Sequence, residues 1–131
     1  MEKIKDLMKK DQFAKNNGIV LLEVAQGTAK VRMEIQNEHF NGVGTVHGGA
    51  IFTLADFAFA AASNSHGSIA VAINVTISFL KAAKTGILIA QAEEISRNPK
   101  LATYSVRVTD DSGDLVAIFQ GMVYIKKQRI D

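Results

Sequence analysis

The segment from His47 to Ser63 constrains the fold more than any other part of the chain. Its apolar residues fall on every side of a helix and not along one stripe. A helix of this kind is buried, because other elements must cover all of its faces. In a chain of 131 residues, we therefore expect one long central helix wrapped by strands. The apolar residues are Ala50, Ile51, Phe52, Leu54, Ala55, Phe57, Ala58, Phe59, Ala60, Ala61 and Ala62.

Strand patterns flank this helix on both sides. Before it, two β-prone runs around Gln26-Gly27 predict a hairpin over about 19–36. After it, residues 69–79 alternate with a period of two, which is typical of a strand. Further strands are expected at 87–96, 101–110 and 115–127, separated by short turns. Strands joined by turns this short are predicted to pair antiparallel with their neighbours in sequence.

The chain begins with a short amphipathic pattern. Ile4, Leu7 and Met8 lie at helical spacing among charged residues, which predicts an N-terminal helix within residues 2–15. The fold class is therefore α+β: one curved antiparallel sheet around one long helix, with a short N-terminal helix. We expect a single domain over 1–131, since neither linker nor repeat interrupts the pattern.

Composition excludes several classes of protein. The sequence contains no cysteine, so disulfides and thiol catalysis are excluded and a cytoplasmic protein is expected. The net charge is only +2, with basic residues scattered among acids, so we expect no nucleic-acid partner. No apolar run is long enough for a spanning helix, and the first eleven residues lack the apolar stretch of a secretory signal.

Asp56 is the first candidate for chemistry. It is the only ionisable side chain between His47 and His66, and it falls in the middle of the predicted buried helix. Burying an unpaired carboxylate is costly, so such a residue has either a partner or a task. The pattern alone leaves both readings open, the first being pairing with a backbone amide or a neighbouring arginine.

The second candidate is the loop before the helix. Backbone N–H groups of Gly48, Gly49 and Ala50 are expected among the unpaired donors of the helix start, where they favour a developing negative charge. Asn41 lies in the same glycine-rich loop and carries an amide that both donates and accepts. A plain glycine turn and an asparagine that only shapes its loop are the structural alternatives.

Helix geometry separates these two candidates. Gly48 and Asp56 are eight residues apart, which along one helix is about 12 Å. Contacts with one carbonyl and its attacking water must be near 3 Å. If both groups act on one substrate, they must come from different chains. We therefore predict a site shared across a two-fold dimer.

The pattern NxxGxxHGGxxxxLAD, over Asn41 to Asp56, resembles the signature of hotdog-fold thioesterases of the phenylacetic-acid-degradation (PaaI-like) type. The resemblance extends along nearly the whole chain. It implies a hotdog fold and hydrolysis of a small, medium-chain or aromatic acyl-CoA. Coenzyme A would then be part of the substrate, with no separate cofactor, and the resemblance also implies a dimer of dimers.

The resemblance assigns roles to the loop and helix residues. Asp56 would be the general base or nucleophile, and the N–H of Gly48 would bind the thioester oxygen. Asn41 would orient that carbonyl, His47 would shape the loop and contact the thioester, and Gly49 would bind the substrate. A purely structural His47 bonded to backbone is an equal alternative.

One position departs from the family pattern. The family often has Ser or Thr on the strand after the helix, and here that position falls on Ala72, which lacks a hydroxyl. Strict alternation would place Asn74 and Thr76 on the same face, where either would take over. The coenzyme would also contact the loop Arg97-Asn98-Pro99-Lys100-Leu101, with Arg97 and Lys100 toward phosphates; ordinary loop charges are the alternative.

Other chemistries lack support in the sequence. His39, His47 and His66 show no metal-ligand spacing, so no metal site is predicted. Neither a nucleophile elbow nor a dinucleotide-binding glycine pattern is present. Two alternatives within the resemblance stay open: a hotdog hydratase or dehydratase, and a module that binds acyl-CoA without hydrolysing it.

Overall fold

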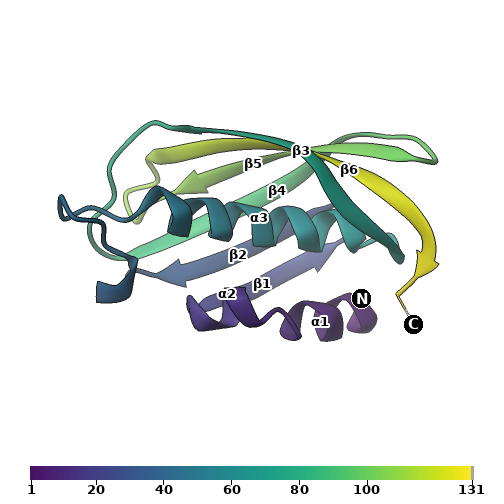
Figure 1. Ribbon diagram of the computed structural model, residues 1–131, viewed down its shortest axis with the longest axis horizontal. Helices are drawn as coiled ribbons and strands as arrows, with labels where there is room; N and C mark the ends of the chain where they lie inside the picture. The colour runs from purple at the N-terminus through teal and green to yellow at the C-terminus, as the bar shows by residue number, and fades with distance from the viewer. Residues whose placement is uncertain (131) are drawn as a thin grey trace.

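The computed structural model describes residues 1–130 as one curved antiparallel sheet closed around a long helix (Figure 1). The helices are α1 (Glu2–Lys9), α2 (Gln12–Asn16) and α3 (Gly48–Asn64), with a 3₁₀ turn at Asn37–His39. The strands are β1 (Ile19–Ala25), β2 (Thr28–Glu34), β3 (Ser68–Phe79), β4 (Ile87–Arg97), β5 (Leu101–Thr109) and β6 (Leu115–Arg129). The hotdog architecture expected from the sequence is confirmed.

Helix α3 lies inside the curve of the sheet, as its all-round apolar pattern predicted. Leu54, Ala55 and Ala58 are completely buried. One side is less covered, because Phe52 keeps 36% of its surface exposed and Asp56 is only half-buried. Within residues 1–130, no helix is both long and apolar enough to cross a membrane.

The strand order corrects the expected pairing. The order is β1-β2-β4-β5-β6-β3, so β3 pairs with β6 and not with β4, the next strand in sequence. Residues 80–86 do not form a tight hairpin turn; Ala83 accepts from Val46 N–H and Gly86 accepts from Ile35 N–H. The connection is thereby held against β2 and the loop before α3. As a result, β3 is left as an edge strand of the sheet.

Strand β3 also departs from strict alternation. The register shifts between Ala72, opposite Val123, and Asn74, opposite Met122. Val123 is buried and Met122 is its neighbour on the opposite face of β6, so this bulge turns Ala72 inward and Asn74 outward. The prediction that Asn74 and Thr76 share the face of Ala72 is therefore wrong.

The N-terminal helix is broken in two. Asp11 stands between α1 and α2, and its carboxylate accepts the N–H of Ala14 at 3.0 Å. Asp is a favoured N-cap residue, so a new helix begins there instead of α1 continuing. Ile4 and Met8 are buried as expected, whereas Phe13 is 67% exposed.

The aromatic core depends on a glycine in β6. A Cβ at Gly121 would lie 2.6 Å from the ring of Phe59, whose ring centroid is 5.4 Å from that of Phe119. We expect Gly121→Ala to lower the free energy of unfolding by about 1–3 kcal/mol, because the buried rings must shift. Denaturant unfolding measures this loss. Gly42→Ala is the control, since nothing lies within 4 Å of its Cβ position; equal stability of both variants would contradict this packing.

Candidate active site

Asp56 lies halfway along α3 on its open side. Within residues 1–130, its carboxylate has neither a hydrogen bond nor an ion pair. Burial raises the pKa of Asp56, and the nearby carboxylate of Asp11 raises it further. The expected alternative, an Asp56 paired with backbone or arginine, is thus not what the fold shows. The carboxylate is free to accept a proton from, or attack, a molecule beside α3.

The start of α3 offers fewer donors than its sequence suggested. His47 is the N-cap, and its Nδ1 accepts the N–H of Gly49 at 2.7 Å. The N–H of Ala50 donates to His47 O at 3.0 Å. In the described chain, this leaves the N–H of Gly48 without an acceptor. Of the three donors expected to be free, only that of Gly48 is available to a ligand.

Both glycines of the HGG sequence allow close packing. A Cβ at Gly48 would lie 3.2 Å from the ring of Phe79 at the end of β3. At Gly49, a Cβ would lie 2.9 Å from Nδ1 of His47. Any larger residue at Gly49 would therefore push the His47 ring away from its hydrogen bond. Since Nδ1 accepts, we infer that the neutral ring carries its proton on Nε2.

Asn41 organises the loop before α3. Its Oδ1 accepts N–H groups from Val43 and Thr45, both at 3.1 Å, and its Nδ2 donates to Oγ1 of Thr45 at 3.0 Å. The buried His39 anchors the same loop, because its backbone oxygen accepts from His47 N–H at 2.7 Å. The loop-shaping role weighed for Asn41 is thus present, and one amide hydrogen remains for a ligand.

The predicted coenzyme loop lies at the opposite end of α3. Asn98 forms the β4–β5 turn, since its Oδ1 accepts from Lys100 N–H at 2.9 Å and from Leu101 N–H at 2.8 Å. Lys100 is exposed. Arg97 buries one terminal guanidinium nitrogen that has no hydrogen-bond acceptor among residues 1–130. Lys100 therefore stands exposed on the turn, whereas Arg97, the last residue of β4, lies beside Glu94 and Tyr104 and its charge acts on the pKa of both.

A polar network ties this end of the sheet to the end of α3. Glu94 accepts from Tyr104 Oη at 2.6 Å and from His66 Nε2 at 2.8 Å. Desolvation acts to raise the pKa of Glu94, but these hydrogen bonds outweigh it and lower that pKa. Glu94 therefore stays ionised and holds the segment after α3 beside β4 and β5.

Lys81 belongs neither to the residues around the start and middle of α3 nor to those of the β4–β5 turn. Its Nζ donates to Asp110 at 2.7 Å and to Asp114 at 2.6 Å, and these bonds raise the pKa of Lys81. Its charge is already matched by two carboxylates. Lys81 is therefore a poor partner for a phosphate.

Two contributions were not foreseen from the sequence. Asp11 lies close enough to Asp56 to raise its pKa, and the Glu94 network fixes the far end of α3. The N-cap role of Asp11 was readable from its place before a short helix, but its position beside Asp56 depends on tertiary packing. Among residues 1–130, no three His, Asp or Glu side chains are grouped so as to hold a metal ion.

Comparisons with known proteins show the family to which this chain belongs. The Thioesterase superfamily model matches residues 43–117, which include Asp56 and Gly48. A relative from Archaeoglobus fulgidus, whose name goes no further than esterase, is 44% identical over 95% of this chain and 82% of its own. Acyl-coenzyme A thioesterase PaaI of Escherichia coli is 37% identical over 85% of this chain and 80% of its own.

Solved structures show the same likeness. The E. coli PaaI structure superposes with a TM-score of 0.94 at 32% identity, covering 98% of this chain and 94% of that one. A Streptococcus mutans protein bound to acetyl CoA gives 0.81 at 26% identity, covering 85% and 90%. The chain belongs to the Thioesterase superfamily, and within it to the PaaI-like acyl-CoA thioesterases. It is a thioester hydrolase.

The proximity of Asp11 to Asp56 can be tested by titration. Asp11→Asn removes a negative charge but keeps an N-cap acceptor for α2, so we expect the pKa of Asp56 to fall. Asp56 would then ionise at lower pH. Carboxyl carbon chemical shifts followed by NMR across pH measure the change. Asp6→Asn on α1 is the control, and an unshifted Asp56 titration in Asp11→Asn would contradict the proximity.

Proposed function

We propose that this protein hydrolyses a small, medium-chain or aromatic acyl-CoA, with Asp56 acting at the thioester carbonyl. One observation carries the proposal: Asp56 is half-buried on the open side of α3 with no partner for its carboxylate in the described chain. A carboxylate left unpaired at a cost in free energy is typical of a reacting group. The identities of the relatives support the reaction class.

The reaction follows from the free groups. As general base, ionised Asp56 takes a proton from water while the hydroxyl oxygen adds to the thioester carbon. The carbonyl oxygen becomes an oxyanion, which the N–H of Gly48 stabilises at the positive end of α3. The C–S bond then breaks and the coenzyme A thiolate leaves. As nucleophile, Asp56 would add to the carbon itself and expel the thiolate, which leaves a mixed anhydride. Labelled water that opens this anhydride at the Asp56 carboxyl carbon would leave its oxygen in Asp56 in a single turnover.

The active site is proposed to combine two chains. Within one chain, Gly48 and Asp56 stand about 12 Å apart along α3, too far for one carbonyl. The edge strand β3 exposes Val71 and Ile73, by 38% and 54%. Pairing β3 with its two-fold copy would cover these residues and set the helices antiparallel. Gly48 and Asn41 of one protomer would then face Asp56 of its partner.

The coenzyme part of the substrate is placed next to basic side chains. Arg97 and Lys100, at the end of α3 away from Gly48, are proposed to meet the coenzyme phosphates, with Asn98 and Leu101 shaping their turn. Ala72 is exposed on the inner face of the edge strand β3 and has no hydroxyl, while Asn74 lies on the outer face. Water positioning is therefore assigned to Asp56 and Asn41 and not to a β3 side chain. A dimer of dimers is the proposed assembly.

Replacing Asp56 tests the chemistry. We expect Asp56→Asn to reduce kcat for thiol release by about 10²–10⁴-fold while substrate still binds, because an amide cannot take the proton. The raised pKa means that ionised Asp56 lowers stability above that pKa, so the neutral variant should unfold at the same or higher temperature at neutral pH. Stopped assays of free thiol and thermal unfolding measure both. Unchanged turnover would end the proposal.

Replacing Ile73 tests the dimer. Ile73→Glu places a charge at the centre of the exposed β3 edge, where two copies would repel each other. We expect sedimentation to show protomers where the parent chain forms dimers or larger, together with loss of thiol release. Ile95→Glu on β4, similarly exposed at 56%, is the control. A fully active monomeric parent chain would contradict the shared site.

A further inference from the structure

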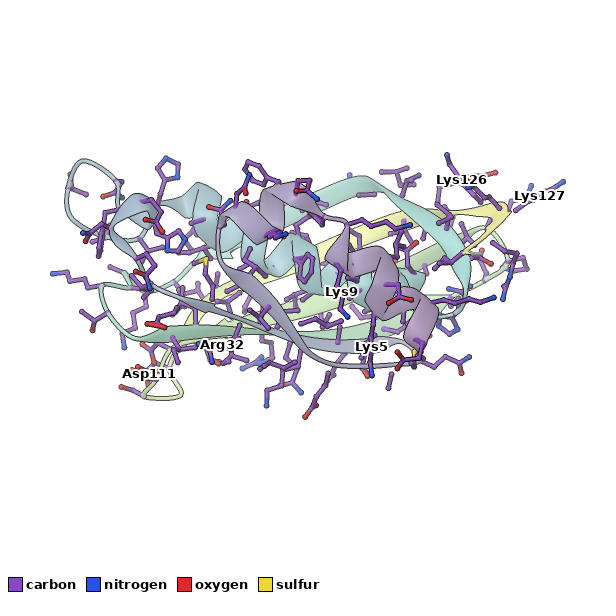
Figure 2. All side chains as sticks on the ribbon, turned by 90° about the horizontal axis from the view of Figure 1, so that it is seen from below. Lys5, Lys9, Arg32, Asp111, Lys126 and Lys127 are labelled. Atoms are coloured by element: carbon purple, nitrogen blue, oxygen red, sulfur yellow. The ribbon has the colours of Figure 1, made fainter. Side chains whose placement is uncertain are left out.

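His39 lies in the interior of the molecule, where side chains of its kind are rare. Among residues 1–130 it is the only buried His, Lys, Arg, Asp or Glu side chain, with 2% of its surface exposed. Charged side chains normally extend into solvent, as Lys126 and Lys127 do at the end of β6 in Figure 2. His39 takes no part in the reaction steps proposed for Asp56 and Gly48. Another role must therefore account for its position.

Both ring nitrogens of His39 are paired with backbone groups, and these belong to separate segments. Nδ1 accepts the N–H of Gln36 at 2.9 Å, at the start of the 3₁₀ turn Asn37–His39. Nε2 lies 3.0 Å from the carbonyl oxygen of Asn17, the residue that ends α2. Because an N–H only donates and a carbonyl oxygen only accepts, the neutral ring carries its proton on Nε2. The imidazole therefore joins the end of α2 to the 3₁₀ turn.

The backbone of the same residue holds the start of α3. His39 N–H donates to Gln36 O at 3.0 Å, and His39 O accepts the N–H of His47 at 2.7 Å. His47 in turn accepts the N–H of Gly49 through its Nδ1, also at 2.7 Å. The N–H of Gly48 lies between these two bonded N–H groups along the chain. Its direction is therefore set by the bonds on either side of it.

Sheet topology explains why α2 meets the 3₁₀ turn. Strand β1 begins two residues after Asn17, and β2 ends three residues before the turn (Figure 1). The two strands are antiparallel, and Ile19 at the start of β1 pairs with Met33 near the end of β2. The end of α2 is thereby brought beside the turn that leads to α3. Asn17 O is thus a fixed anchor, since it belongs to an element that packs against β1.

The other hydrogen bonds of the loop stop short of α3. Those of Asn41 reach no further than Thr45, and the N–H of Val46 donates to Ala83 O at 2.9 Å. In the part of the chain that the structure describes, the N–H of His47 has one acceptor, the carbonyl oxygen at the end of the 3₁₀ turn. That single bond fixes the residue next to the proposed oxyanion donor.

We propose that His39 is a positioning residue of the active site. Its ring holds the 3₁₀ turn against α2, and its carbonyl oxygen thereby holds His47 so that the N–H of Gly48 is aimed at the oxyanion in advance. A donor aimed in advance stabilises the developing charge without reorganisation. This inference rests on the role proposed for Gly48 in thioester hydrolysis. His39 is buried and acts only through His47.

Three substitutions separate the two ring bonds of His39. His39→Asn can supply an acceptor for Gln36 N–H but lacks the donor to Asn17 O. His39→Gln can supply that donor but leaves the N–H of Gln36 unpaired, and His39→Phe removes both bonds. The two conservative variants should each restore part of what His39→Phe loses.

Kinetics of free thiol release from acetyl-, octanoyl- and benzoyl-CoA measure the effect. We expect His39→Phe to lower kcat at least about tenfold while KM stays within about twofold of the parent value, because only an interaction made in the transition state is weakened. His39→Asn and His39→Gln should give intermediate kcat values.

Ser65→Ala is the matched control. Ser65 is buried at the far end of α3, where its Oγ accepts the N–H of Gly27 at 2.7 Å and donates to Ala62 O at 2.6 Å. The substitution removes buried hydrogen bonds to two backbone groups, as His39→Phe does, but away from the start of α3. We expect it to lower stability and to leave kcat for each folded molecule unchanged.

Hydrogen exchange followed by NMR gives a second measurement that does not depend on turnover. The N–H groups of His47 and Gly49 are both bonded in the parent chain. Local opening at the start of α3 should make them exchange at least about tenfold faster in His39→Phe than in Ser65→Ala. A substitution that only lowers global stability would accelerate exchange throughout the core instead.

The outcomes separate this inference from the proposed function. A parent-like kcat in folded His39→Phe overturns the inference, as does a rise in KM alone or an equal loss of kcat in Ser65→Ala. If His39→Phe does not fold, parent-like kcat and exchange in both His39→Asn and His39→Gln overturn it. If the parent chain releases thiol from none of the three substrates, the proposed function fails, and exchange at His47 and Gly49 alone decides whether His39 holds the start of α3.

Discussion

The burial of α3 inside the curved sheet is the constraint on which the rest of the structure depends. Every side of this helix is apolar, so the sheet must curl around it, and one side stays open along Gly49, Phe52, Thr53, Asp56 and Ala60. An isolated carboxylate on such a helix is costly to bury. Its raised pKa is the sign of that cost. The fold thus holds an unpaired carboxylate in a partly buried position.

In the loop before α3, unlike at Asp56, the polar groups form hydrogen bonds with one another. Nδ1 of His47 accepts the N–H of Gly49, and Oδ1 of Asn41 accepts the N–H groups of Val43 and Thr45. A rigid loop with one donor left over is well suited to bind an oxyanion, because no reorganisation is needed when the charge develops. The unpaired donor and the unpaired carboxylate are separated along one helix. In the proposed dimer, each chain would contribute these two groups to different sites.

Much of this was readable from the sequence, for reasons that are local. The all-round apolar segment gave α3 to within one residue at each end, and the hairpin around Gln26-Gly27 formed as expected. The predictions that were wrong concern contacts between segments distant in sequence. The pairing of β3 with β6 and the bulge between Ala72 and Asn74 depend on contacts between distant segments, and no period in the sequence reports them. The position of Asp11 beside Asp56 has the same origin.

The most direct test of the shared site is a mixing experiment with two variants. Asp56→Asn lacks the carboxylate, while Gly48→Pro lacks the backbone N–H at the first position of α3, where a helix tolerates proline; each alone should release little thiol. When the two are unfolded together and refolded at equal amounts, half of the dimers are mixed and each contains one intact site, so about a quarter of the parent activity should return. If no activity returns although mixed dimers form, both half-sites belong to one chain and the account is contradicted.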